Sequence, residues 1–222
     1  FRTTRGYYQG TYTSKEADVR WQLGYIDQAF GANTFYSYKF PDQYEELRRY
    51  MVSVQAETKG RIRFSPTVYW NRKHDNFQLV KGTATGENFH LNDVYGANLN
   101  AHFNTRLGKT AFGAELRNEG ILSPNLGKEL TEGEYVNIPG ENGKQFKRTD
   151  NRTNVSYYAE HNILLPRLTF SLGIMANMNT FLDHKYRYEP GIDMSHRPAL
   201  HWKLFAYWNK ALIMPTWTDL YY

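Results

Sequence analysis

Apolar and polar residues alternate with a period of two along most of the chain. Within residues 62–70, the even positions are apolar and most odd positions are polar. Successive side chains of a β-strand point to opposite faces, so this alternation predicts strands with one apolar and one polar face, about ten in all, and no helix. The clear strands are expected at residues 18–26, 44–57, 61–70, 95–103, 112–117, 168–177 and 202–209, and weaker ones at 5–13, 150–162 and 186–196.

Short and long connections alternate between these strands. The short ones are expected at 14–17, 58–60, 106–109, 163–167 and 197–200, and the long ones at 27–43, 71–89, 119–149, 178–185 and from 210 onward. Successive turns of an up-and-down sheet lie at opposite ends, so all short turns fall on one rim and all long loops on the other. Outer-membrane barrels have this layout, with short periplasmic turns and long extracellular loops. A soluble β-sandwich would scatter its loop lengths among Greek-key connections.

The polar face of these strands carries Arg, Glu, Asn and Gln together with several Gly. Such a face is too hydrophilic for the core of a small soluble barrel, whereas an outer-membrane barrel is apolar outside and polar inside. We therefore predict an all-β fold: an antiparallel up-and-down transmembrane β-barrel segment of about ten strands.

Composition agrees with a barrel and excludes a helical membrane protein. The chain is 41% apolar with a mean hydropathy of −0.70, and no apolar run approaches the roughly 20 residues of a spanning helix. Its 18 Tyr, 13 Phe and 5 Trp are an unusually large aromatic set, and Tyr and Trp gather at membrane interfaces. Cysteine is absent, which suits a barrel held by strand pairing. The net charge of +5 indicates a basic surface that is solvated, or that attracts anionic ligands or nucleic acid.

The most specific sequence motif of the chain lies in residues 209–222, NKALIMPTWTDLYY. This segment resembles a motif of TonB-dependent outer-membrane receptors, in which a proline is followed by Ser or Thr, an acid and Leu-Tyr-Tyr. The matching residues are Pro215, Thr216, Asp219, Leu220, Tyr221 and Tyr222. Ile213 and Met214 depart from the Arg-Ala expected before the proline. Residues 31–48, 112–123 and 150–162 are similar to the cobalamin-receptor-like branch of the family.

The resemblance implies a location in the bacterial outer membrane and a barrel of 22 strands filled by a plug. Residues 1–222 would form a partial barrel domain, with the plug and the C-terminal strands absent from this chain. The implied function is energised, TonB-dependent uptake of a scarce nutrient: cobalamin or another corrinoid first, haem or an iron siderophore as alternatives. The implied partners are this small-molecule nutrient, outer-membrane lipid, the TonB complex acting through the plug, and a surface lipoprotein, with no nucleic acid.

Candidate ligand contacts fall on the long-loop rim. They combine aromatic rings, charges and amides, which together suit capture of a nutrient by shape and a few polar anchors. A membrane-interface girdle and solvated loop tips are the alternative interpretations. The candidates are Phe35, Tyr36 and Tyr38 in the first long loop, Arg72, His74, Asp75 and Phe77 in the second, and Arg117, Asn118 and Glu119 where a strand enters the third.

Sequence motifs of enzymes and metal sites are missing. The seven His show no His-x-x-x-His spacing, and no Gly-x-Ser-x-Gly, phosphate loop or His-Glu-x-x-His occurs. We therefore expect no catalytic residue, no metal and no cofactor. Two further alternatives stay open: a barrel hydrolase built from scattered rim residues, and a soluble β-rich module that binds carbohydrate or nucleic acid.

Overall fold

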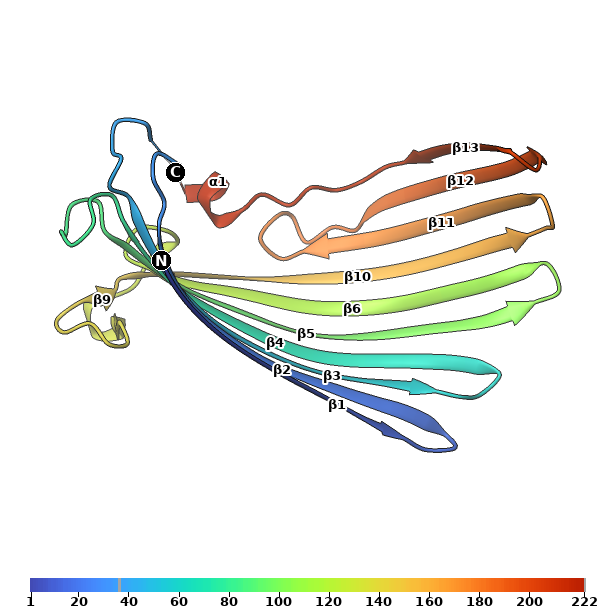
Figure 1. The fold of residues 1–222 in the computed structure, drawn as a ribbon, viewed down its shortest axis with the longest axis horizontal. Helices are drawn as coiled ribbons and strands as arrows, with labels where there is room; N and C mark the ends of the chain where they lie inside the picture. Colours follow the sequence, from blue (N-terminus) through green and yellow to red (C-terminus); the bar gives the residue numbers. More distant parts are fainter. Residues whose placement is uncertain (36, 222) are drawn as a thin grey trace.

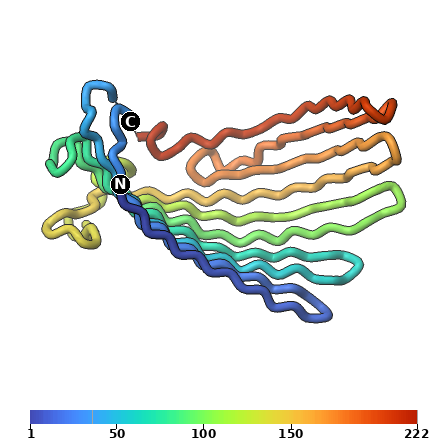
Figure 2. The backbone as a smooth tube through the Cα atoms, in the orientation of Figure 1, coloured from blue at the N-terminus to red at the C-terminus, as the bar shows by residue number. Residues whose placement is uncertain are grey.

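Ten long strands form one curved antiparallel sheet in the computed structural model, which describes residues 1–35 and 37–221 (Figure 1). The strands are β1 (Arg2–Thr13), β2 (Ala17–Gly31), β3 (Tyr44–Thr58), β4 (Ile62–Gln78), β5 (Asn88–Thr105), β6 (Gly108–Ser123), β10 (Arg148–Leu164), β11 (Leu168–Asn179), β12 (Arg187–Ala199) and β13 (Trp202–Asn209). Their order across the sheet is their order along the sequence, as Figure 2 shows, so the up-and-down prediction is confirmed. The edge strands β1 and β13 do not pair with each other in the described part of the chain, so the sheet is open.

Connection lengths alternate as expected. The short turns lie at residues 14–16, 59–61, 106–107, 165–167 and 200–201, all at one end of the sheet, on the right in Figure 1. The long connections and the last residues of the chain lie at the opposite end. We call these two ends the short-turn rim and the long-loop rim.

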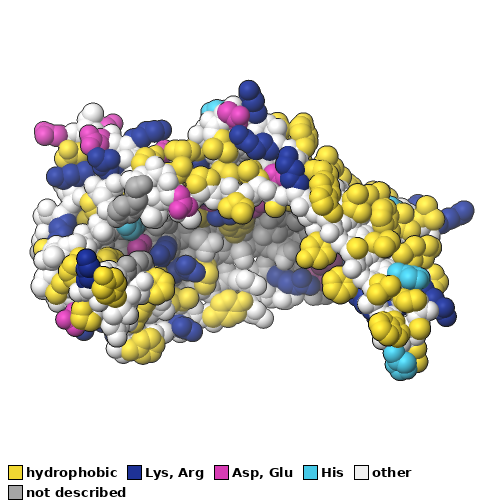
Figure 3. All heavy atoms as spheres, turned by 90° about the horizontal axis from the view of Figure 1, so that it is seen from above, with side chains coloured by type: hydrophobic (Ala, Val, Ile, Leu, Met, Phe, Trp, Pro, Cys, Tyr) yellow, Lys and Arg dark blue, Asp and Glu magenta, His cyan; other side chains and the backbone are white. Residues whose placement is uncertain are grey.

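The strand register separates an apolar outward face from a polar concave face. Across β2 to β5, Leu23 pairs with Val52, Val52 with Trp70, and Trp70 with Tyr95. The positions between them point into the hollow of the sheet and are mostly polar. Outward Val68, Leu99 and Leu116 each expose half or more of their surface, and hydrophobic side chains crowd the surface around the short-turn rim in Figure 3. Exposed apolar side chains gathered on one face mark a surface that meets a membrane or another protein.

Several strands extend further toward the long-loop rim than the alternation predicts. Residues 71–78 belong to β4 and residues 119–123 to β6, so the second long connection shrinks to 79–87. In β4 the apolar alternation stops here because the outward positions 72, 74, 76 and 78 are polar. The ladder continues through polar cross-strand contacts. Arg72 donates to Asp93 from Nε at 2.8 Å and from Nη2 at 2.6 Å.

Helix is confined to short segments in the described residues: η1 (Glu132–Glu134) and α1 (Trp217–Tyr221). No described helix is long and apolar enough to cross a membrane. The expectation of no helix therefore fails at α1. This segment has no strand-like alternation, and a local capping motif starts its single turn.

The longest connection, residues 124–147, packs on the outward face above the strands. It contains β7 (Lys128–Glu129), which pairs with β10, and the hairpin of β8 (Val136–Asn137) and β9 (Gln145–Phe146). Its apolar residues join those of β5 and β6 in one buried cluster, made of Phe89, Leu91, Leu122, Ile138 and Phe146. This loop therefore forms an outer buttress and leaves the concave face open.

Phe146→Ala is expected to detach this buttress. Phe146 is 1% exposed, and removing a ring from such a site costs about 3–5 kcal/mol. We expect faster cleavage within residues 128–147 in limited proteolysis. The matched control is Val136→Ala, because Val136 is the register partner of Phe146 but is 40% exposed. Equal cleavage rates in the two variants would contradict docking through Phe146.

Candidate functional site

The chain after β13 runs back to the long-loop rim and ends in α1 (Figure 1). Thr216 precedes the helix, where its Oγ1 accepts a hydrogen bond from the Asp219 backbone N–H at 3.2 Å. In return, Asp219 Oδ2 accepts from the Thr216 backbone N–H and hydroxyl, each at 2.8 Å. These reciprocal bonds form a capping box. The bonds from the Thr216 backbone and side chain also lower the pKa of Asp219. The Thr and Asp of the sequence motif therefore cap the start of this helix.

A buried ion-pair network holds this segment on the concave face. Arg152 of β10 faces Glu119 of β6 in the register and donates to it from Nε at 2.7 Å. Arg117 contacts the other oxygen of Glu119 at 2.6 Å. Arg152 Nη1 also donates to the Pro215 carbonyl at 2.7 Å, and its guanidinium lies 4.6 Å from the centre of the Trp217 ring. Glu119 and Arg152 are each 8% exposed, so one buried arginine joins the sheet to the start of α1.

A second set of contacts fixes the end of α1. The Tyr221 hydroxyl donates to Asp150, a carboxylate that also lies 3.5 Å from Lys128 Nζ. Phe181, from the connection between β11 and β12, packs edge-on against Trp217 and Tyr221 at centroid distances of 6.1 Å and 6.4 Å. Burial, the hydrogen bond to Asp150 and the charge of that carboxylate raise the pKa of Tyr221 to about 12. The helix is therefore positioned by an aromatic stack and two polar anchors.

A cavity of about 610 Å³ lies between the start of α1 and the concave face of β4 to β6. This volume falls within the range of about 300–1,000 Å³ that is usual for small-molecule sites. Its walls combine two aromatic rings, aliphatic side chains, and polar groups of both charges. The lining residues are Lys73, Asp75, Phe77, Asn88, His90, Asn92, Ile121, Leu126, Thr216, Trp217 and Thr218. We call this the lumen pocket.

The lumen pocket holds a carboxylate oxygen without a hydrogen bond. Asp75 Oδ1 is buried and has no hydrogen-bond partner in the described residues, since Lys73 Nζ lies 3.7 Å away. Buried polar atoms are normally satisfied, so this oxygen is available to a donor on a bound molecule. On the next strand, His90 Nδ1 lies 2.9 Å from Ser123 Oγ, which fixes the imidazole ring in the wall of the pocket.

The aromatic candidates of the first long loop lie apart from this pocket. Phe35 borders a separate cavity of about 520 Å³ with Phe30 and Glu45, and the Phe35 side chain is 79% exposed. Tyr38 is 81% exposed, with Lys39 over its ring at 6.0 Å. Tyr36 and Tyr222 lie outside the described residues.

The remaining candidates divide between the two faces of the sheet. Asp75 and Phe77 line the lumen pocket, while Arg117 and Glu119 lie beneath α1. Because side chains alternate along a strand, Arg72, His74 and Asn118 fall on the outward face. Arg72 there pairs with Asp93 and lies 5.5 Å from the Trp70 ring, and Asn118 donates to Asn151 and Thr153 at 2.7 Å and 2.9 Å. The structure therefore does not bring these three residues to the pocket.

Four residues that position α1 were not among the candidates: Asp150, Arg152, Phe181 and Trp217. No spacing in the sequence connects them, since Arg152 meets Glu119 only through the pairing of β6 with β10. Trp217 lies within residues 209–222, the segment that resembles the receptor motif. Its place between Pro215 and Asp219 was the one sequence feature that could have identified it as a site residue. Among the described residues, no group of three or more His, Cys, Asp or Glu side chains is arranged to hold a metal ion.

No protein-family model matches the sequence, and no curated protein matches it. Among solved structures, the fold is similar to that of the siderophore receptor PirA from Acinetobacter baumannii, with a TM-score of 0.66 and 12% sequence identity. The match covers 96% of this chain and 34% of that receptor chain. At this identity the likeness shows the fold alone: the sheet corresponds to a barrel segment of a receptor.

Arg152→Ala is expected to release α1 from the sheet. The substitution leaves Glu119 with Arg117 as its one remaining charged partner in the described residues and removes the donor to Pro215. Breaking a buried ion pair costs about 3–5 kcal/mol. We expect Trp217 fluorescence to become accessible to acrylamide, measured against a Trp217→Phe background. Arg187→Ala is the control, because its partner Asp183 at 3.1 Å is exposed and such pairs contribute about 1 kcal/mol or less. Similar quenching in both variants would argue against the anchor.

The docking of α1 is also expected to weaken at high pH. The folded-state pKa of Tyr221, about 12, lies above its ordinary value of 10.0. The hydrogen bond to Asp150 is therefore fully present below pH 10 and is lost as pH rises through about 12. Acrylamide quenching of Trp217 should increase in that interval. Tyr221→Phe should lack this step, and an unchanged step in that variant would assign it to another group.

Proposed function

We propose that this chain is the ligand-binding part of an outer-membrane receptor that takes up a small-molecule nutrient. The observation that carries the proposal is the lumen pocket, which lies on the polar concave face of a sheet whose outward face is apolar. An apolar surface that faces lipid and a polar hollow with a ligand site are the two parts that such a receptor requires. Binding here needs no covalent step, so the proposal contains no catalytic residue.

Side chains of the lumen pocket suit an amphiphilic ligand with several hydrogen-bonding groups. Phe77 and Trp217 supply aromatic surfaces, Lys73 a cation, and Asp75 an acceptor that lacks a hydrogen bond. The asparagines and threonines of the wall both donate and accept. Such a lining favours an organic molecule with several polar groups over a bare ion or a purely apolar molecule.

Three ligand classes are candidates: an iron siderophore, a corrinoid and haem. An iron siderophore is supported by the fold shared with PirA, a siderophore receptor, and by the size of the cavity. A corrinoid is supported by the sequence resemblance of residues 31–48, 112–123 and 150–162. Haem is the third candidate, and energised transport through a TonB complex, a plug and a surface lipoprotein also rests on the resemblance.

Phe77→Ala is expected to weaken ligand binding about tenfold, which corresponds to about 1.4 kcal/mol, because it removes an aromatic wall of the lumen pocket. Asp75→Asn should weaken binding by a similar factor if the ligand donates to this carboxylate. The measurement is tryptophan quenching on the full-length receptor in detergent, titrated separately with a ferric catecholate siderophore, a ferric hydroxamate siderophore, cyanocobalamin and haemin.

Arg72→Gln is the matched control, since Arg72 is close to both residues in sequence but lies on the outward face. Its affinity for the same probe should equal that of the unaltered receptor. Absence of binding by all four probes at micromolar concentration, or equal weakening by Arg72→Gln and Phe77→Ala, would count against the lumen pocket as the ligand site.

A further inference from the structure

Positive charge is concentrated at the short-turn rim. The rim comprises the five short turns with three residues on each side, at residues 11–19, 56–64, 103–110, 162–170 and 197–204. These segments hold nine Lys or Arg and three acids, a formal charge of +6. The rest of the chain holds 18 Lys or Arg and 19 acids. The whole positive balance of the protein therefore lies at one end of the sheet.

The few acids of this rim are already engaged. Asp18 pairs with Lys59 at 2.8 Å, Glu57 lies 3.7 Å from Arg63, and Glu16 accepts from the Ser14 hydroxyl at 3.0 Å. Seven further cations make no ion pair in the described residues. They are Lys15, Arg61, Arg106, Lys109, Arg167, Arg197 and Lys203.

At the long-loop rim, several cations form ion pairs with acids of the same rim. Arg72 pairs with Asp93, Arg148 with Glu129, and Lys144 with both Glu87 and Glu141. Charge at the long-loop rim is thus largely neutralised within the chain. At the short-turn rim, by contrast, cations outnumber acids by nine to three, so most of them have no acid within the rim to pair with.

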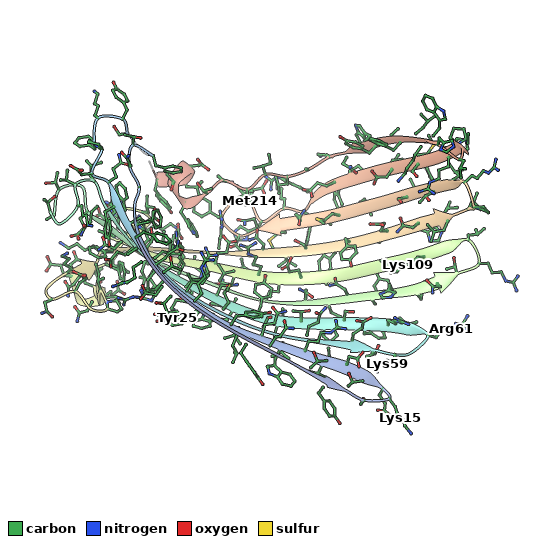
Figure 4. All side chains as sticks on the ribbon, in the orientation of Figure 1. Lys15, Tyr25, Lys59, Arg61, Lys109 and Met214 are labelled. Atoms are coloured by element: carbon green, nitrogen blue, oxygen red, sulfur yellow. The ribbon has the colours of Figure 1, made fainter. Side chains whose placement is uncertain are left out.

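Three hairpins of the short-turn rim also present exposed apolar residues close to their cations. Leu107 adjoins Arg106, Leu165 lies two residues before Arg167, and Leu200 and Trp202 flank His201 near Arg197 and Lys203. Figure 4 shows the labelled Lys15, Lys59, Arg61 and Lys109 at the short-turn end of their hairpins. Apolar side chains next to long cations are typical of a membrane interface, where the hydrocarbon stem stays in the apolar layer and the charge reaches the headgroups.

We propose that the short-turn rim binds the phosphate groups of anionic phospholipids in the leaflet that it faces. A protein partner would contact one sector of the rim, whereas these cations recur on every hairpin across the sheet, at the border of the apolar outward face. A lipid leaflet meets all of them at once. Each exposed Lys or Arg near an anionic lipid surface adds to the attraction, and salt weakens it. The inference rests on the proposed membrane location.

The test uses the full-length protein in vesicles of phosphatidylcholine with or without phosphatidylglycerol. Tryptophan quenching by brominated phosphatidylglycerol, compared with brominated phosphatidylcholine, reports which lipid surrounds the protein. We expect a severalfold enrichment of phosphatidylglycerol that disappears at high salt. The triple variant R61Q/R106Q/R167Q should lower this enrichment toward unity.

The charge-matched control is K39Q/K147Q/K185Q, which removes three exposed cations of the long-loop rim. It should keep most of the enrichment. Equal losses in both triple variants, or no enrichment in the unaltered protein, would overturn the inference while the receptor proposal stands, provided that the protein inserts into the vesicles. Failure to insert into any vesicle would overturn the membrane location and this inference with it.

Discussion

The antiparallel ladder, with its strict alternation of side chains, is the constraint on which the rest of the structure depends. Every strand must keep one register, since a slip by one residue would turn its apolar face into the hollow and its polar face outward. The pairing of Leu23 with Val52 and of Val52 with Trp70 shows this register continuing from strand to strand. The ladder provides hydrogen bonds for the backbone N–H and C=O groups. The side chains of one face can therefore suit an apolar environment and those of the other face a polar one.

The residue types on the outward face change near the long-loop rim. Below it, apolar residues recur at every second position, and above it the same face carries polar pairs such as Arg72 with Asp93 and Asn118 with Asn151. The sheet continues past this border because cross-strand hydrogen bonds replace apolar contact as the force between neighbouring side chains. This extension raises the concave wall far enough for Asp75 and Phe77 to form one side of the lumen pocket.

The strands and their two faces were predictable because a period of two is visible in local sequence. Strand ends near the long-loop rim were not, since Arg72 and Asp75 read as loop residues once the apolar alternation stopped. Of the four candidates from the second long connection, Asp75 and Phe77 line the lumen pocket, while Arg72 and His74 lie on the outward face. The Arg152 anchor depends on the pairing of strands far apart in the chain, which no local pattern reports.

The two elements nearest the pocket are held in different ways, and this difference explains why the pocket is accessible. The 124–147 buttress is fixed by an apolar cluster around Phe146 on the outward side, so the longest loop contributes mainly Leu126 to the pocket. The α1 segment instead rests on Arg152, Asp150 and an aromatic stack with Phe181, all at the concave face. Polar anchors of this kind are sensitive to the charge and hydration of whatever enters beside them. Since Trp217 both stacks on Arg152 and lines the lumen pocket, a bound ligand would contact the same ring that holds the helix in place.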